Sequence, residues 1–452
     1  MSKFSLDERI EFKGYWYLPS NPQNTVAGIV TYYPNDKIVL NLMGGFDNSP
    51  LKLFENFNNN KEETIIYGKT SDAKEVSLLQ SYYSSFDLNT NADFPIVQYT
   101  SRFMIIGRHI KSLDEKYQYD AIVEIPELSL WCQPNALKTT FLFDKEGDVK
   151  QMNLSINTSF PNNADIINST KINENTTIRI RQEALYKGDS LNPEIKQHSY
   201  LEIHKKTNTT IKDLLSNLLI YEQFLSLATL NIVKCSKITL HDKKSFQQIG
   251  KRKLYKKIYI IHPFIERKNL QDTASKSHKF LFYYSTIKKE YPTVIQKWFN
   301  ESAELAPIRS HLIGSLEKKR VYSSIDFLIV IQAIEGFYRR FRSAKYRKEY
   351  NIPEKASSKL YPMLKELISE FSDVDLIVKS NIDIDAVVDS RKYFSHFMPK
   401  SSSFKALDGL ELFELTKKIR ILLLCCVLSY LGFENKQINS ILNQSYSDII
   451  PK

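Results

Sequence analysis

Two side chains suited to the cleavage of RNA lie close together in the C-terminal part of the 452-residue sequence. Arg391 and His396 are separated by four residues within the segment DSRKYFSHF, which begins at Asp389. Cleavage of RNA without a metal uses the 2′-hydroxyl as the nucleophile, and it needs a proton acceptor, a proton donor and a cation on the phosphate. Histidine exchanges protons near neutral pH, and arginine binds phosphate oxygens through paired hydrogen bonds. The pair therefore has the side chains of a metal-independent ribonuclease.

The spacing alone also allows a structural interpretation, in which Arg391 forms a surface ion pair and His396 a hydrogen bond inside a helical bundle. Arg102 and His109 repeat the pattern with six intervening residues, but they lie in a strand-rich region where we expect no catalysis. Arg309 also has a histidine two residues away and is interpreted as structural.

One histidine does not readily act as both proton acceptor and proton donor in a single step. A homodimer that brings two copies of the motif together would place a histidine on each side of the phosphate. The rings of Tyr393, Phe394 and Phe397 are available to seal such an interface, and for two of the three the alternative is packing in the core of the bundle. A helix start near residues 389–390 would add its positive dipole end to each copy. These features predict a homodimer with a shared site.

Two further charged residues are candidates to support the motif. Glu335 lies among apolar residues in the middle of a helical segment. It has two available partners, Arg391 across the bundle and Arg339 one helical turn away. Lys392 directly follows the motif arginine, where a cation is able to hold phosphate.

The positive charge of the chain is concentrated in its middle. The net charge is +11, yet residues 236–350 contain 25 Lys/Arg against 10 Asp/Glu, which indicates a polyanionic partner. Two clusters stand out, one at residues 251–257 and one at residues 339–348. The second supplies the candidate RNA-binding residues Arg339, Arg340, Arg342 and Arg347. The alternative interpretation of each cluster is a solvated helix end or surface.

Helices are expected throughout the C-terminal part of the chain, where apolar residues recur at helical spacing. Caps such as Gly432 mark their ends. Short connections between helices of this length predict a compact bundle of about four antiparallel helices. The expected helices are Ile325–Tyr346, Lys355–Phe371, Ile384–Phe397 and Asp408–Leu431.

The first 205 residues or so are instead predicted to form many short strands. The first is a hairpin, Val26–Tyr33 with Ile38–Met43, and a polar loop is expected at residues 157–175. Such a pattern is typical of a β-sandwich or a barrel. A basic strand pair is expected at Lys237–Leu240 and Lys253–Ile261. The further expected strands are 63–67, 96–110, 119–125, 139–143, 149–156, 176–181 and 200–204.

The chain is therefore expected to be a multidomain α+β protein. The predicted divisions are a β-rich N-terminal domain at residues 1–205, a mixed, basic connecting region at residues 206–320 and an all-helical bundle at residues 321–452.

The cysteines and apolar runs give no sign of export, membrane insertion or metal binding. Cys132, Cys235, Cys425 and Cys426 form no C-x-x-C pair, which favours buried free thiols in a reducing cytosol. The longest apolar run, Ile421–Phe433, is too short to cross a bilayer. We expect a cytoplasmic protein without metal or cofactor.

The C-terminal region, from Tyr322 to Leu442, resembles the HEPN superfamily, and in particular the ApeA-like HEPN proteins of bacterial anti-phage defence. The resemblance is carried by the segment FLIVIQAIEGFYRR from Phe327, by the Arg391/His396 motif, and by LTKKIRILLL from Leu415. The N-terminal region is similar to the ApeA N-terminal domain, at FKGYWYLP from Phe12 and at LNLMGGF from Leu40.

The resemblance implies a metal-independent endoribonuclease, acting as a dimer with Arg391 and His396 as catalytic residues. It departs from the superfamily at Lys392, where Asn, Asp or His often follows the arginine. The implied role is abortive infection: cleavage of cellular RNA, with transfer RNA as one candidate, after the N-terminal domain senses an unidentified phage trigger. The alternatives are a non-enzymatic HEPN module that dimerises and binds a ligand or RNA, and a general nucleic-acid-binding protein supported by the basic middle.

Overall fold

The structure is a computed structural model of the whole chain. It describes residues 4–46, 64–87, 94–133, 137–156, 165–187, 191–192, 194–250, 252–263, 280–300, 302–317, 324–342, 359–397 and 404–446. The chain forms two compact units. The β unit comprises Met1–Ser129, Pro134–Leu219 and Lys234–Lys268, and the helical unit comprises Leu130–Gln133, Ile220–Val233 and Asn269–Lys452. The division falls inside helix α3 (Ile211–Thr229), whose first half belongs to the β unit.

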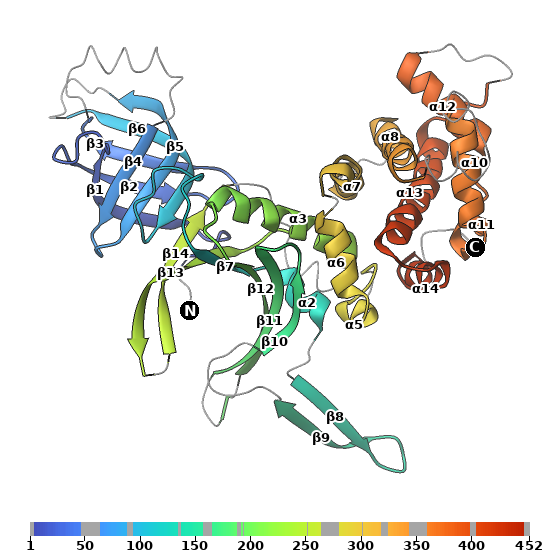
Figure 1. The fold of residues 1–452 in the computed structure, drawn as a ribbon, viewed down its shortest axis with the longest axis horizontal. Coiled ribbons are helices and arrows are strands. Elements are labelled where there is room, and N and C mark those ends of the chain that lie inside the picture. Colours follow the sequence, from blue (N-terminus) through green and yellow to red (C-terminus); the bar gives the residue numbers. More distant parts are fainter. Residues whose placement is uncertain are drawn as a thin grey trace. The chain divides into compact units, whose positions relative to one another are not determined.

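The first part of the β unit is a closed barrel. Within the described residues six strands pair around it in the order β1-β2-β3-β6-β5-β4, and β4 returns to β1. Of the two predicted architectures, sandwich and barrel, the structure therefore has the barrel (Figure 1). The barrel strands are β1 (Ile10–Tyr17), β2 (Val26–Tyr32), β3 (Ile38–Met43), β4 (Thr64–Thr70), β5 (Glu75–Asp87) and β6 (Ile96–Ile106).

Trp16 organises the interior of the barrel. Its indole is fully buried, and Nε1 donates a hydrogen bond to the carbonyl of Gly28 at 3.1 Å. The ring lies directly against the Cα of Gly68, where a Cβ would come within 2.3 Å of it. The barrel therefore requires glycine at position 68, because any side chain there would displace the tryptophan.

The sheet continues beyond the barrel, from β6 through β14, β13, β7, β12, β11 and β10. The predicted strands in this stretch are confirmed, and so is the basic pair. The loop expected at residues 157–175 is wrong for its second half, because Asp165–Lys171 forms β10, which pairs with β11. Residues 157–164 lie outside the described part. The added strands are β7 (Tyr119–Glu124), β10, β11 (Thr176–Lys187), β12 (Glu194–Lys205), β13 (Lys237–Ile249) and β14 (Arg252–Ile261).

Two hairpins project from the β unit (Figure 1). One is formed by the outer halves of β13 and β14. The other pairs β8 (Leu137–Phe143) with β9 (Val149–Ile156) in a separate two-stranded sheet. A short helix, α2 (Pro126–Cys132), follows β7.

The helical unit contains the four predicted helices at nearly the predicted positions. They are α8 (Ser324–Phe341), α10 (Leu360–Glu370), α12 (Ile384–His396) and α13 (Gly409–Leu431). Residues 343–346 and 355–358, expected at the ends of the first two helices, lie outside the described part. The remaining helices are α5 (Tyr284–Ile287), α6 (Tyr291–Asn300), α7 (Ser302–Glu317), α11 (Asp375–Ser380) and α14 (Asn435–Tyr446).

Helix α13 is the centre of this unit, and its caps define its length. Asp408 accepts a hydrogen bond from the backbone N–H of Gly409 at its start, and Gly432 adopts the left-handed conformation at its end. Cys425 and Cys426 are buried in α13 as free thiols, and burial raises the pKa of both. No helix among the described residues is both long enough and apolar enough to cross a membrane.

Candidate functional site

The Arg391/His396 motif occupies the second half of helix α12. The helix begins at Ile384, capped by Asp383, whose carboxylate accepts a hydrogen bond from the N–H of Ala386. This bond, followed by the charge of Lys405, lowers the pKa of Asp383. The expected helix start at Ile384 is therefore confirmed, whereas the start near residues 389–390, which would have placed the positive end of the helix dipole beside Arg391, is wrong. His396 is the last helical residue, so the negative end of the helix dipole lies beside the motif.

Two side chains of α12 tie the helix to the segment that leads into α13. The hydroxyl of Ser390, which is fully buried, accepts a hydrogen bond from the N–H of Leu407 at 2.9 Å. The carboxylate of Asp389 accepts one from the N–H of Lys405 at 3.1 Å. Both bonds are formed by the two residues directly before Arg391, and α12 also packs on α8 and α10. The backbone that carries Arg391 is therefore fixed on both sides.

Arg391 and His396 are in direct contact. Arg391 Nη1 lies 3.1 Å from His396 Nε2. Since a guanidinium only donates, the lone pair must be on Nε2, and we assign the neutral ring with its proton on Nδ1. His396 is exposed, and the Arg391 side chain retains 34% of its accessible surface. The contact therefore lies at the surface, within reach of a large substrate.

Glu335 on α8 has both of the partners expected from the sequence. One carboxylate oxygen lies 3.4 Å from Arg391 Nε, and the other lies 3.4 Å from Arg339 Nη2. The side chain is 13% exposed, more buried than either arginine. Glu335 therefore holds the Nε side of Arg391, while Nη1 of the same guanidinium reaches His396. The two alternatives left open by the sequence are both present.

Lys392 pairs within its own helix. Its amine lies 3.4 Å from Asp389 Oδ1, an exposed i,i+3 contact. Asp389 thus accepts the hydrogen bond from the backbone of Lys405 and also pairs with Lys392. The sequence did not identify Asp389 or Ser390 as anchoring residues, because their partners lie 16 and 17 positions further along the chain.

The four candidate RNA-binding arginines have different surroundings. Arg339 is exposed and adjoins Glu335, and Arg340 is exposed and donates to the carbonyl of Glu304 at 2.7 Å. Arg342 donates to the carboxylate of Glu370 through three hydrogen bonds of 3.2, 3.0 and 2.9 Å, and it also donates to Ser429. Arg347 lies outside the described residues. Arg339 and Arg340 are thus the better placed of the described three to meet a polyanion.

The residues of the other Arg/His combinations are engaged in structural contacts. Arg102 lies over the ring of Tyr82. His109 stacks on Tyr67 at 4.4 Å and contacts the carbonyl of Gly68 at 3.1 Å. Arg309 is buried against Trp298, and burial lowers its pKa to about 10. We assign no catalytic role to these residues.

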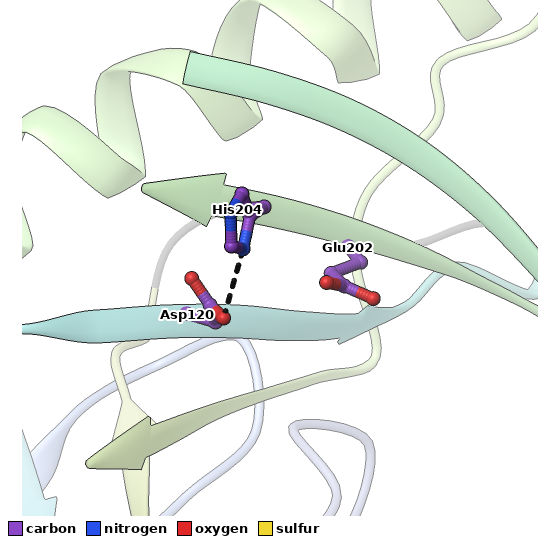
Figure 2. A group of neighbouring side chains, drawn as sticks. All are labelled: Asp120, Glu202 and His204. Carbon is purple, nitrogen blue, oxygen red and sulfur yellow. Dashed lines mark hydrogen bonds and ion pairs between the residues drawn. The ribbon is translucent and has the colours of Figure 1, made fainter. Parts of the chain in front are cut away.

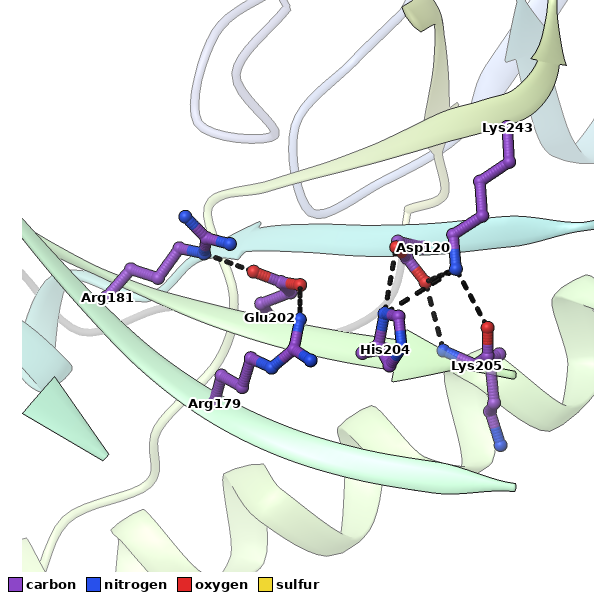
Figure 3. Close-up of polar contacts among 7 residues, drawn as sticks. All are labelled: Asp120, Arg179, Arg181, Glu202, His204, Lys205 and Lys243. Carbon is purple, nitrogen blue, oxygen red and sulfur yellow. Dashed lines mark hydrogen bonds and ion pairs between the residues drawn. The ribbon is translucent and has the colours of Figure 1, made fainter. Parts of the chain in front are cut away.

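Two groups of side chains in the described residues have the spacing of metal ligands. Asp120, Glu202 and His204 form the first, on neighbouring strands of the β unit (Figure 2). Its carboxylates already have cationic partners (Figure 3). The second group, Asp144, Glu146 and Asp148, is fully exposed at the β8–β9 turn.

The cationic partners account for the charge of the first group. Glu202 pairs with Arg179 at 2.7 Å and also with Arg181. Asp120 pairs with Lys243 at 2.9 Å and contacts His204 at 3.1 Å. The carboxylates of the first group are therefore held in two separate sets of ion pairs, one around Glu202 and one around Asp120 (Figure 3).

Comparison with known protein families identifies both parts of the chain. Residues 11–298 match the family described as ApeA N-terminal domain 1. Residues 328–437 match the Apea-like HEPN family and include α12 with its motif. The comparisons with curated proteins and with solved structures found no match.

A β-barrel region followed by a helical bundle with an Arg/His motif thus defines an HEPN-type protein. The chain belongs to the ApeA family, with an ApeA N-terminal domain 1 and an Apea-like HEPN domain.

Proposed function

We propose that this protein is a metal-independent HEPN endoribonuclease of anti-phage defence. The observation that carries the proposal is the contact between Arg391 and His396 on α12, supported from behind by Glu335 on α8. It brings a phosphate-binding cation and a proton-transferring ring together at an exposed helix end. HEPN domains are generally ribonucleases, which agrees with this chemistry.

The proposed reaction uses the 2′-hydroxyl of the substrate. The Nε2 lone pair of a histidine accepts the hydroxyl proton, the 2′-oxygen attacks phosphorus, and the bond to the 5′-oxygen breaks as that oxygen receives a proton. The products are a 2′,3′-cyclic phosphate and a 5′-hydroxyl. Arg391 holds the phosphate oxygens. Because Nε2 of His396 accepts a hydrogen bond from Arg391 in the free protein, that bond must break before Nε2 takes the hydroxyl proton, and the guanidinium N–H that is released is then available to the phosphate.

The second proton transfer is assigned to a second copy of the chain, whose His396 enters the step as the imidazolium and leaves it neutral, while the first histidine becomes protonated. We propose a homodimer through the helical unit, in which each protomer contributes an Arg391 and a His396. Phe397, which ends α12 in the left-handed conformation, is 88% exposed beside the motif and is available to the interface.

This composite site predicts dominant interference. An excess of His396→Ala protomers mixed with wild type should suppress cleavage, because mixed dimers lack one histidine. Subunit exchange followed by an RNA cleavage assay tests this. Full activity in the presence of excess mutant, or in a monomeric form, would exclude the shared site.

The cellular role is part of the same proposal. We propose that the protein acts in the cytoplasm, that it causes abortive infection by cutting cellular RNA such as transfer RNA, and that its N-terminal domain receives a phage trigger. The barrel offers a groove of about 660 Å³ for a ligand, lined by residues that include Lys13, Tyr15, Met43 and Lys69.

The alternative function is a non-enzymatic HEPN module that dimerises and binds a ligand or RNA. The observation in its favour is that Arg391 and His396 form a hydrogen bond with each other, as polar residues with a purely structural role do. One experiment distinguishes the two functions. Cells expressing wild type or His396→Ala are challenged with phage, and total RNA is examined for new ends. Wild type should produce them and His396→Ala should not, whereas the module predicts identical RNA from both.

A further inference from the structure

The basic cluster at residues 251–257 lies on a projecting β-hairpin. Residues 243–257, here called the hairpin arm, contain seven Lys/Arg and no Asp/Glu. In the described residues β7 pairs with β13 only over Lys237–Asp242, and β6 pairs with β14 only over Tyr259–Ile261. The arm beyond these positions is a two-stranded ribbon that extends away from the sheet (Figure 1).

The base of the arm is fixed by ion pairs. Asp242, which is buried, pairs with Arg108 at 2.5 Å. Lys243 reaches Asp120 at 2.9 Å and the carbonyl of Lys205 at 2.8 Å (Figure 3). The carboxylates nearest the arm are therefore already bound to cations. These ion pairs anchor the base of the arm and occupy the acidic groups there.

The outer lysines face solvent. The described residues offer no ion-pair partner to Lys244, Lys253 or Lys257, all three of which are exposed. Lys256 differs, since it contacts Glu75 at 3.3 Å. Where backbone hydrogen bonds are open at both edges of a ribbon, lysines also discourage pairing with other strands. Protection of a strand edge does not require aromatic residues, yet aromatic rings of the arm lie in contact with one another.

Aromatic rings form a column along one face of the arm. Phe246 is opposite Tyr255 in the register, and their rings lie 6.0 Å apart. Tyr255 stacks on His241, 6.3 Å away. Burial, and then the charge of Lys257, lowers the pKa of His241, so it joins the column as a neutral ring. Lys253 lies over Phe246 at 4.5 Å.

We propose that the hairpin arm binds single-stranded nucleic acid. Phe246, 42% exposed at the outer end of the column, would stack on an unpaired base, and Lys244, Lys253 and Lys257 would contact the backbone phosphates. An anionic membrane would use the same charges, but it gives no reason for rings aligned along one strand pair. In a single strand of nucleic acid, base rings alternate with phosphates. On β14, the ring of Tyr255 lies between the amines of Lys253 and Lys257 in the sequence of that face. The site is independent of the nuclease assignment.

Binding is measured by fluorescence anisotropy on the full chain carrying His396→Ala, so that cleavage does not interfere. The probe is a labelled 12-nucleotide single-stranded RNA, and the same sequence is tested as DNA and as a duplex. Replacing Phe246 with alanine should weaken binding of the single strands about tenfold. Lys253→Glu with Lys257→Glu should lower the slope of log affinity against log salt by roughly 1.4, about 0.7 for each phosphate that is no longer neutralised.

The β8–β9 hairpin supplies the matched control. It also projects and exposes rings, Phe141 and Phe143, but its turn is acidic. Phe141→Ala and Lys150→Glu should leave the affinity unchanged. Phe246→Trp should retain binding, which separates stacking from a folding defect. Equal losses from both hairpins, unchanged binding in the arm variants, or preferential binding of the arm to phosphatidylglycerol vesicles would each overturn the proposal.

Discussion

Two glutamates of this protein each bridge two arginines, and their surroundings differ. Glu202, on β12 of the β unit, is 3% exposed and pairs with Arg179 and Arg181 on the neighbouring strand β11. Glu335, in the helical unit, pairs with Arg391 and Arg339 at 3.4 Å each. The sheet register fixes the first set, whereas the second joins two helices through long side chains.

The comparison separates a structural ion pair from one that can exchange partners. Both arginines of Glu202 are half-buried, with 24% and 28% of their side-chain surface exposed, and they lie on the strand next to it. Arg391 is more exposed, its ion pair is longer, and its guanidinium also holds His396, the proposed catalytic histidine. A phosphate forms a charge-assisted hydrogen bond with arginine, which is stronger than a bond to a neutral imidazole ring. The contact between Arg391 and His396 is therefore suited to break when substrate binds. Substitutions at the two glutamates and at the neighbouring arginines test this difference.

The largest effect on stability should come from Glu202→Gln. It leaves two guanidinium groups in the sheet without their counter-charge. We expect a loss of about 2–3 kcal/mol in the free energy of unfolding, below the range for a fully buried pair because the arginines are partly exposed. Urea unfolding of the full chain measures it. A change of less than about 0.5 kcal/mol, within the usual range for a surface substitution, would show that these ion pairs do not hold the sheet.

Glu335→Gln should behave in the opposite way. Its pairs are partly exposed, so the free energy of unfolding should fall by about 1 kcal/mol or less. Cleavage should nevertheless slow about tenfold, because Arg391 loses the group that orients it. The RNA cleavage rate of the folded variant decides this. A wild-type cleavage rate in Glu335→Gln would mean that Glu335 matters only for its ion pair with Arg339 within α8.

The smallest effect is expected from Arg339→Glu with Arg340→Glu, which should weaken RNA binding several-fold and flatten its salt dependence. Arg342→Glu is a contrasting control. Since Arg342 is bound by Glu370, its replacement should destabilise the bundle before it changes the salt dependence. Equal salt slopes in wild type and the Arg339/Arg340 variant would remove both arginines from the RNA surface.

Much of the helical unit could be predicted because its helices carry their own end signals. Asp408 and Gly432 mark the limits of α13, and Phe397 is the residue at which α12 ends. Strand β5 could not be predicted, for the converse reason. Its register is interrupted by irregularities, and Gln80 within it has a positive φ of 53°. A bulge of this kind breaks the alternation that identifies a strand.

The site shows the same division. The Arg391/His396 spacing and the Glu335–Arg339 pair are local, so the sequence was enough to propose both. The contact between Glu335 and Arg391, and the engagement of Arg342 by Glu370, join positions 56 and 28 residues apart. The sequence predicted the first only as one of two alternatives and did not predict the second, since charge alone does not say which counter-ion folding brings near.

The central claim is that Arg391 and His396 cleave RNA through the 2′-hydroxyl. The most direct test incubates purified wild type, Arg391→Ala, His396→Ala and the neighbouring control Ser395→Ala with end-labelled RNA in EDTA, followed by analysis of the new termini. We predict 2′,3′-cyclic phosphate ends from wild type and from Ser395→Ala, and a loss of about 10³-fold or more in the two motif variants. Wild-type rates in both motif variants, or products that carry a 3′-hydroxyl, would contradict the claim.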